Sequence, residues 1–148
     1  MRTAALAAVV LAAFGVGCGT PRGPRLIWEG AGGAPRAADA SEWASTLATR
    51  QPGVRVGVWG ASPDATYQLL ETRTPERPHV HETHDLTVVL LRRRGVLHVD
   101  GREHPMAAGD VAHIGRGRVH AFVPSGSEPT LGLAIFSPAM VQPDYRDR

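Results

Sequence analysis

Apolar and polar residues alternate in short runs through most of the chain beyond residue 50. Valine alternates with other residues over 54–59, and Tyr67 and Leu69 share one face of the run 66–72. Because a period of two is typical of a strand with one buried face, these runs predict two strands of a hairpin. Further apolar runs, separated by Gly, Pro or charged residues, lie at 86–91, 96–99, 102–106, 111–114, 119–123 and 131–136. Short strands at near-regular spacing predict an all-β sandwich or barrel.

One segment near the N-terminus has helical character. Asp39 is followed three residues later by Glu42, as in a capping box, and Trp43 and Leu47 lie one turn apart. We therefore predict one short helix over 39–49 that lies on the sheet. The turn Asp100-Gly101 is a strong hairpin signal between two of the predicted strands.

The first residues have the composition of an export signal. Arg2 precedes an apolar run over 4–16, which is shorter than the roughly 20 residues of a membrane-spanning helix. We predict a signal peptide at 1–17 and a Gly- and Pro-rich tether at 18–36, in which residues 26–28 form a short docked strand. The domain would then span 37–138, with its core strands in 54–137, and the polar tail 139–148 would lie loosely on the surface.

Cys18 is the single cysteine of the chain and directly follows the apolar run. Its surroundings resemble the lipobox of bacterial lipoproteins, although Gly15 stands where Leu is usual. The resemblance implies cleavage before Cys18, lipidation of its sulfur, and a membrane-anchored protein of the bacterial cell envelope. The alternative is a soluble periplasmic or secreted protein in which Cys18 is removed or incidental.

Composition excludes several classes of function. The 148 residues suggest one domain, and the formal net charge is only +2. Every basic side chain other than histidine is Arg, so a Schiff-base or lysine-base mechanism is excluded. The run Arg92–Arg94 reads as a solvated turn. No aromatic residues interleave with basic ones in a nucleic-acid motif, so nucleic acid is not an expected partner.

Three histidines and one acid have the spacing of metal ligands. His79 and His81 lie two apart, so an extended strand would direct both imidazoles to the same side. Asp85 follows four residues later, and His120 ends the segment GDVAHIGRGRVH. Three imidazoles and one carboxylate form a nitrogen and oxygen ligand set for a divalent ion. Fe, Mn, Zn, Ni and Cu all tolerate this set, which leaves coordination positions open.

These residues resemble the two motifs of the cupin family. His79, His81 and Asp85 stand at the places of the first motif, with Asp where Glu is usual. Gly109-Asp110 and the segment ending in His120 stand at the places of the second. The pattern departs from the family at Gly115, where Pro is usual, and at Arg92, where Gly is common.

The resemblance implies a double-stranded β-helix, or jelly-roll barrel, with the four residues as ligands of one divalent metal. It also implies a small-molecule ligand or substrate, and dioxygenase or isomerase chemistry among other options. A homodimer through sheet edges remains open by the same analogy. One fold hosts many functions, so a non-catalytic lipoprotein that binds or senses a metal or small ligand is the alternative, and an inactive scaffold is a third.

Other polar residues have no assigned role from the sequence. His84 adjoins Asp85 and competes with it as a ligand. His113 either lines the barrel behind the metal or is a structural histidine. His98 and His104 are expected to be solvated. A catalytic base is not identified, although Glu71, Gln68 and Tyr67 are candidates by sequence order.

Overall fold

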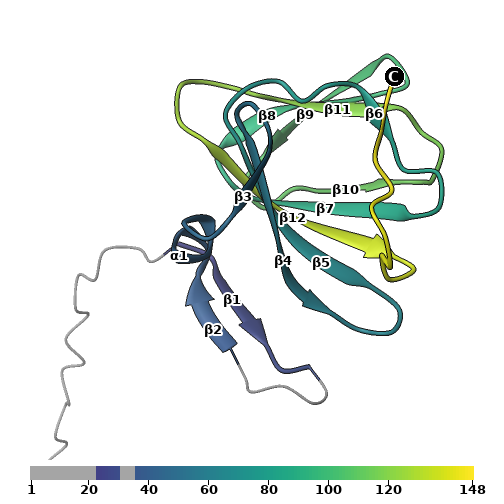
Figure 1. Ribbon diagram of the computed structural model, residues 1–148. Coiled ribbons are helices and arrows are strands. Elements are labelled where there is room, and N and C mark those ends of the chain that lie inside the picture. The colour runs from purple at the N-terminus through teal and green to yellow at the C-terminus, as the bar shows by residue number, and fades with distance from the viewer. Residues whose placement is uncertain (1–22, 31–35) are drawn as a thin grey trace, which may run out of the picture.

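The computed structural model describes residues 23–30 and 36–148. The predicted signal peptide, Cys18 and most of the predicted tether lie outside this range. The described part is built mostly of antiparallel strands, with one short helix (Figure 1). Within that part of the chain, no helix has the length and apolar character needed to cross a membrane.

The elements follow one another in an order close to the one predicted. In chain order they are β1 (Arg25–Trp28), β2 (Arg36–Asp39), α1 (Ala40–Ala44), β3 (Ala48–Gln51), β4 (Val54–Ala61), β5 (Thr66–Thr72), β6 (His79–Val80), β7 (Asp85–Arg92), β8 (Arg94–Val99), β9 (Arg102–Ala107), β10 (Val111–Ile114), β11 (His120–Pro124), β12 (Thr130–Ser137) and β13 (Arg146–Asp147).

Two large sheets face each other and enclose the interior of a barrel (Figure 1). The six-stranded sheet has the order β10-β7-β12-β5-β4-β3, and the five-stranded sheet has the order β13-β6-β11-β8-β9. Neighbours in each sheet are antiparallel and non-consecutive strands are often adjacent, as in a jelly roll. The predicted all-β jelly-roll fold with one short N-terminal helix is confirmed.

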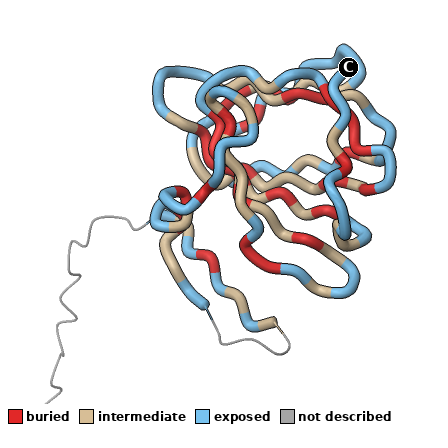
Figure 2. The backbone as a smooth tube through the Cα atoms, in the orientation of Figure 1, coloured by how far each residue is buried: buried red, intermediate tan, exposed pale blue. Residues whose placement is uncertain are grey.

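The apolar faces of the two sheets form the barrel core. Buried residues lie along the strands of both sheets, while most residues of the connecting loops are exposed (Figure 2). The buried members of this core are Leu86, Leu90, Leu97, Met106, Ile114, Ala134 and Phe136. Apolar and polar residues alternate along the strands because every second residue faces the interior.

A second apolar cluster attaches the N-terminal segment to the barrel. Trp28 of β1 packs edge-on against Trp59 and Tyr67, with ring centroids 5.6 Å and 5.2 Å away. Leu69, which is fully buried, belongs to the same cluster. The predicted docked strand at 26–28 is confirmed, and it pairs with β2.

The helix is shorter than predicted. Asp39 caps it as expected, because its side chain accepts a hydrogen bond of 2.8 Å from the Ser41 backbone N–H. The helix ends at Ala44, and the prediction beyond that residue is wrong because 48–51 form β3 on the edge of the six-stranded sheet. The Arg55 side chain donates to the carbonyls of Ala44 and Leu47, which satisfies the end of the helix.

The C-terminal tail also differs from the prediction. It runs from the end of β12 to the edge of the five-stranded sheet (Figure 1), where β13 pairs with β6. Asp144 is buried, and its carboxylate accepts hydrogen bonds from the backbone N–H groups of Glu82 (3.2 Å) and Thr83 (2.8 Å). The tail is therefore part of the barrel wall, because its carboxylate accepts from the backbone of the turn that follows β6.

Candidate metal centre

Three histidines from two paired strands meet inside the barrel. β6 pairs with β11 through His79 and His120, and His81 follows β6 directly. Each of the three offers a ring nitrogen, and these nitrogens all lie within 4.8 Å of one another. The side chains are buried, with ring centroids 4.3 Å apart for His79 and His120. This is the geometry of a metal-ligand cluster, as the His-x-His spacing and His120 predicted.

Backbone carbonyls fix the orientation of all three rings. The Nδ1 atom of His79 lies 2.9 Å from the Arg77 carbonyl oxygen, and that of His120 lies 2.9 Å from the Arg118 carbonyl oxygen. The Nδ1 atom of His81 is hydrogen-bonded to the Asp144 carbonyl oxygen. A carbonyl only accepts, so each Nδ1 carries the proton and each Nε2 has a free lone pair.

The free lone pairs fit a metal ion. The Nε2 atom of His120 is buried and has no hydrogen-bond partner among the described residues. Leaving a buried acceptor unpaired costs about 1–3 kcal/mol, which an ion at this position would offset. A backbone carbonyl on the opposite ring nitrogen is also the usual outer partner of a metal-bound histidine.

Burial keeps the cluster neutral near pH 7. It lowers the pKa of His79 to about 3, and the adjacent His120 lowers it further. Burial also lowers the pKa of His81 to about 4, against the opposing effect of its bond to the Asp144 carbonyl, and it lowers the pKa of His120. Neutral imidazole is the form that binds metal, so an ion would displace no protons from these rings.

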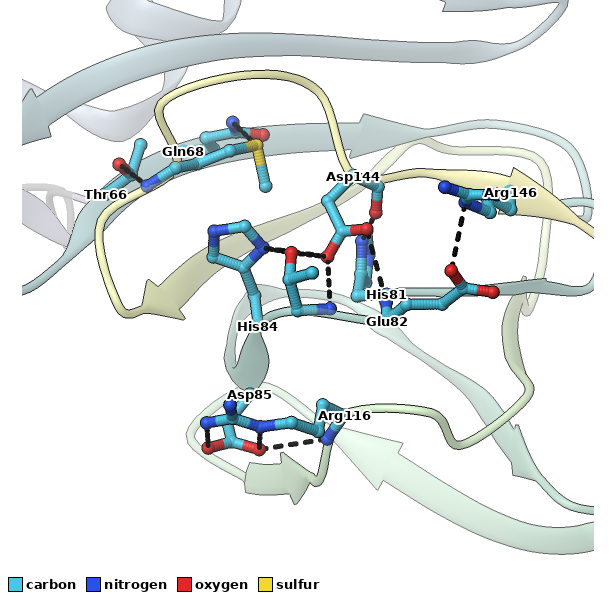
Figure 3. Close-up of polar contacts among 11 residues, drawn as sticks. Thr66, Gln68, His81, Glu82, His84, Asp85, Arg116, Asp144 and Arg146 are labelled. Carbon is cyan, nitrogen blue, oxygen red and sulfur yellow. Dashed lines mark hydrogen bonds and ion pairs between the residues drawn. The ribbon is translucent and has the colours of Figure 1, made fainter.

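Asp85, the predicted carboxylate ligand, does not lie in the cluster. Its side chain pairs with Arg116, at 2.8 Å from the guanidinium Nη2 and 2.9 Å from the backbone N–H (Figure 3). These hydrogen bonds lower the pKa of Asp85 to about 2. Asp85 begins β7, and it directs its carboxylate toward the loop around Arg116 and away from the three imidazoles. The described residues thus assemble three nitrogen ligands and no carboxylate.

The remaining histidines have structural or surface positions. His84 is buried, but its Nδ1 lies 2.8 Å from a carboxylate oxygen of Asp144, outside the cluster. His113 is exposed and contacts the Thr87 hydroxyl at 3.0 Å, so it does not line the barrel behind the site. His104 is exposed, as expected.

The candidate bases have other partners and do not reach the site. Glu71 pairs with Arg55 and Arg73, both at 3.3 Å. Tyr67 lies in the aromatic cluster of the N-terminal segment, and Gln68 contacts the Met140 sulfur. None of the three is among the described residues that line the cavity beside the histidines.

The C-terminal segment supplies residues that the sequence did not reveal. The ring of Tyr145 stacks on His79 with centroids 4.2 Å apart, and the Asp144 carbonyl orients His81. The carboxylate of Asp144 also holds Thr83 and His84 (Figure 3). Neither residue belongs to a motif, and only long-range pairing with β6 brings them to the site.

A cavity of about 60 Å³ lies next to the three imidazoles. Its walls are mostly the apolar side chains of the barrel core. Four polar side chains other than those of histidine and threonine also line it, namely Arg50, Gln51, Glu76 and Tyr145. One water needs about 10–15 Å³ of such space, so the cavity holds an ion together with a few water molecules or a small ligand.

Comparisons with known proteins agree with this architecture. Residues 66–136 match the family model described as "Cupin domain". An uncharacterized protein of Aquifex aeolicus is 40% identical over 78 residues, which is 53% of this chain and 64% of that protein. The match therefore spans less than two thirds of that relative's length.

Several solved structures share the fold. KdgF from Halomonas sp. superposes with a TM-score of 0.60 at 20% identity, over 64% of this chain and 87% of that one. A double-stranded β-helix protein from Klebsiella pneumoniae has a TM-score of 0.62 at 18% identity, covering 74% and 94% of the two chains. The Streptomyces nucleoside dehydratase Pac13 has a TM-score of 0.57 at 18% identity, covering 68% and 82%. The fold is a cupin-type barrel, and the matched domain supports a cupin family.

Because the buried histidines resist protonation, we expect the metal-free protein to lose stability as the pH falls. Unfolded histidines bind protons below about pH 6.5, whereas the folded ones stay neutral down to about 3 or 4, so unfolding becomes easier through that window. Urea unfolding at several pH values measures this slope. Glu76, whose pKa burial raises to about 7, acts with the opposite sign, so the slope is compared with that of a His81→Gln variant. A variant slope as steep as that of the parent would contradict the expectation.

The Asp144→Ala substitution should weaken metal binding by about tenfold, because losing the carboxylate frees the segment whose carbonyl orients His81. Competition for Zn²⁺ with a chromogenic chelator measures the affinity. Glu128→Ala is the matched control, since Glu128 is an exposed acid away from the cluster and forms one long ion pair with Arg93. Equal effects of the two substitutions would show that Asp144 has no special part in orienting the ligand.

Proposed function

We propose that this protein binds a divalent metal ion through His79, His81 and His120 and uses it to hold, or act on, a small organic molecule. The observation that carries the proposal is the convergence of three Nε2 lone pairs, each with its Nδ1 fixed on a carbonyl. Three protein nitrogens leave coordination positions open, which is typical of catalytic metal sites. Fe, Mn, Zn, Ni and Cu all accept this donor set.

A bound ion would supply a Lewis-acid centre for an oxygen of the small molecule. The chain's own contribution is to keep three imidazoles neutral, exclude bulk water with apolar walls, and present Tyr145 beside His79. Similar folds support a small-molecule ligand, because Pac13 is a nucleoside dehydratase whose structures contain uridine. The cupin resemblance suggests dioxygenase or isomerase chemistry for this protein, and we propose both.

A non-catalytic role in binding or sensing a metal or small ligand is the second candidate. The cavity of about 60 Å³ can hold an ion with water molecules alone, because one water needs about 10–15 Å³ of such space. Oxygen uptake and turnover on a panel of chelating acids, with Fe²⁺ or Mn²⁺ added, separate the two roles. Turnover on any of them that requires His120 identifies an enzyme.

Removing one ligand should abolish stoichiometric metal binding. We expect His79→Ala and His120→Ala proteins to lose at least 90% of the bound metal, because two remaining imidazoles hold a divalent ion weakly (about tenfold or more per ligand). Elemental analysis of protein purified from its own host measures the content and identifies the ion. His104→Ala is the control, since that histidine is exposed and distant from the cluster. Retention of metal by the His120→Ala protein would refute the site.

We further propose export and lipidation at Cys18, on the sequence pattern alone. The Cys18→Ser protein should move from the detergent phase to the aqueous phase, because a lipidated sulfur is the expected anchor. Detergent phase partitioning of whole-cell extracts measures this. Partitioning of the variant into detergent like the parent would show that lipid on Cys18 is not the anchor, whereas a parent protein found in the aqueous phase would favour the soluble exported form.

A further inference from the structure

We propose that the arginine turn, made of Arg92, Arg93 and Arg94, docks on the headgroups of an anionic lipid bilayer and orients the barrel on it. The proposal rests on the anchor proposed at Cys18 and adds a second contact with the same membrane. Three features lead to it: the backbone strain at Arg93, the position of the turn beside the entry of the chain into the fold, and a positive charge that nearby acids do not balance.

Arg93 has a backbone conformation that residues other than glycine rarely adopt. Its φ is 70°, in the left-handed region, at the tight connection between β7 and β8. Glycine would adopt this conformation without the steric cost that a Cβ brings. The Arg93 side chain is exposed and belongs to neither apolar cluster. A strained residue that adds no packing indicates a function for its guanidinium group.

The arginine turn lies next to the point where the chain enters the fold. The Pro24 carbonyl accepts a hydrogen bond of 3.0 Å from the Ala40 N–H, so the first described residues lie against the start of α1. Leu91, directly before the turn, packs against the apolar cluster that contains Leu26 and Ala40. The N-terminal hairpin and α1 lie together at one side of the barrel (Figure 1), and the turn is therefore on that side.

A lipid on Cys18 would hold this side close to the bilayer. Five residues lead from Cys18 to Gly23, the first described residue, and an extended chain covers at most about 18 Å over that length. Exposed charges interact over only about 8 Å at physiological salt. A short anchor beside the turn brings its guanidinium groups within that range of the lipid phosphates.

The nearby acids do not balance the charge of the turn. Arg93 and Glu128 form an exposed ion pair of 3.7 Å, which is a weak interaction in water. Arg92 and Arg94 are in none of the ion pairs among the described residues. Hydrogen bonds from Ser41 and, more weakly, the charge of Arg92 lower the pKa of Asp39, whose carboxylate is already engaged as the cap of α1.

The chemistry of the turn suits phospholipid headgroups. A guanidinium group keeps its charge at neutral pH and binds two phosphate oxygens through parallel hydrogen bonds. Each basic residue beside an anionic membrane surface strengthens the association about fivefold. Three arginines on one turn thus give the barrel a preferred side toward the bilayer, which a flexible tether alone does not provide.

The test is energy transfer from tryptophan to dansyl-labelled lipid in vesicles that carry the mature protein. All three tryptophans of the chain belong to, or pack against, the apolar cluster beside the turn, so the transfer reports how near this side lies to the bilayer. We expect more transfer when the vesicles contain phosphatidylglycerol than with phosphatidylcholine alone, and high salt should remove the difference. Arg93→Gly should lower the ratio of docked to undocked protein about fivefold on the anionic vesicles. The double substitution Arg92→Gln and Arg94→Gln should lower it further.

Thermal unfolding of the same variants separates docking from folding. Arg93→Gly should unfold at a temperature no lower than that of the parent, because glycine relieves the strain at this φ. Weaker docking without a loss of stability distinguishes a membrane contact from a structural role. Arg102→Gln is the matched control, because Arg102 is exposed and lies at the opposite end of the β8–β9 ladder from Arg94. It should give the same transfer as the parent.

The mass of the mature protein shows separately whether Cys18 carries lipid. If it does not, the vesicles are titrated into the free protein, and an Arg93-dependent response to phosphatidylglycerol supports the docking turn although the anchor fails. Equal transfer with and without phosphatidylglycerol overturns the inference. So does equal transfer for Arg93→Gly and the parent, or an equal loss for Arg102→Gln, which would reflect net charge alone.

Discussion

The site depends on three hydrogen bonds between imidazole Nδ1–H groups and backbone carbonyls. They set the tautomer of each ring, so that three acceptor nitrogens point into one buried space. Two of these bonds are local, because His79 and His120 each bond the carbonyl two residues before them. The third comes from the far C-terminal segment. Burial then keeps the rings neutral. The apolar barrel core screens charge weakly, so it would strengthen the electrostatic interactions of a bound ion.

Alternation of apolar residues was sufficient to predict an all-β sandwich or barrel, and the cupin resemblance selected the jelly-roll barrel. Strands β5 and β10 have the predicted bounds, and Asp100 and Gly101 both adopt positive φ, as their hairpin turn requires. The period of two shows which face of each strand is buried. This part of the fold can therefore be predicted from neighbouring residues alone. The predicted helix extended too far past Ala44. Leu47 fits the apolar face of a helix, but it fits a buried position under the sheet edge equally well. Tertiary pairing of β3 with β4 decided between them.

The site was predictable only in part. His79, His81 and His120 were identified because strand geometry and their motif fix their direction. Asp85 was expected beside them. The spacing of residues in the sequence could not show that its carboxylate pairs with Arg116 instead. Asp144, Tyr145 and Arg50 carry no local signal at all. They reach the site because β13 and β3 end the two sheets and meet through side chains at the seam.

The place of Asp144 in the chain has a consequence for biogenesis. A polypeptide is made from its N-terminus, so all three histidines emerge before the carbonyl that orients His81. Until residue 144 is in place, one ring is free to adopt either tautomer. The site therefore stays incomplete until residue 144 has been made, and tight binding of the proposed metal would wait until β13 has paired with β6.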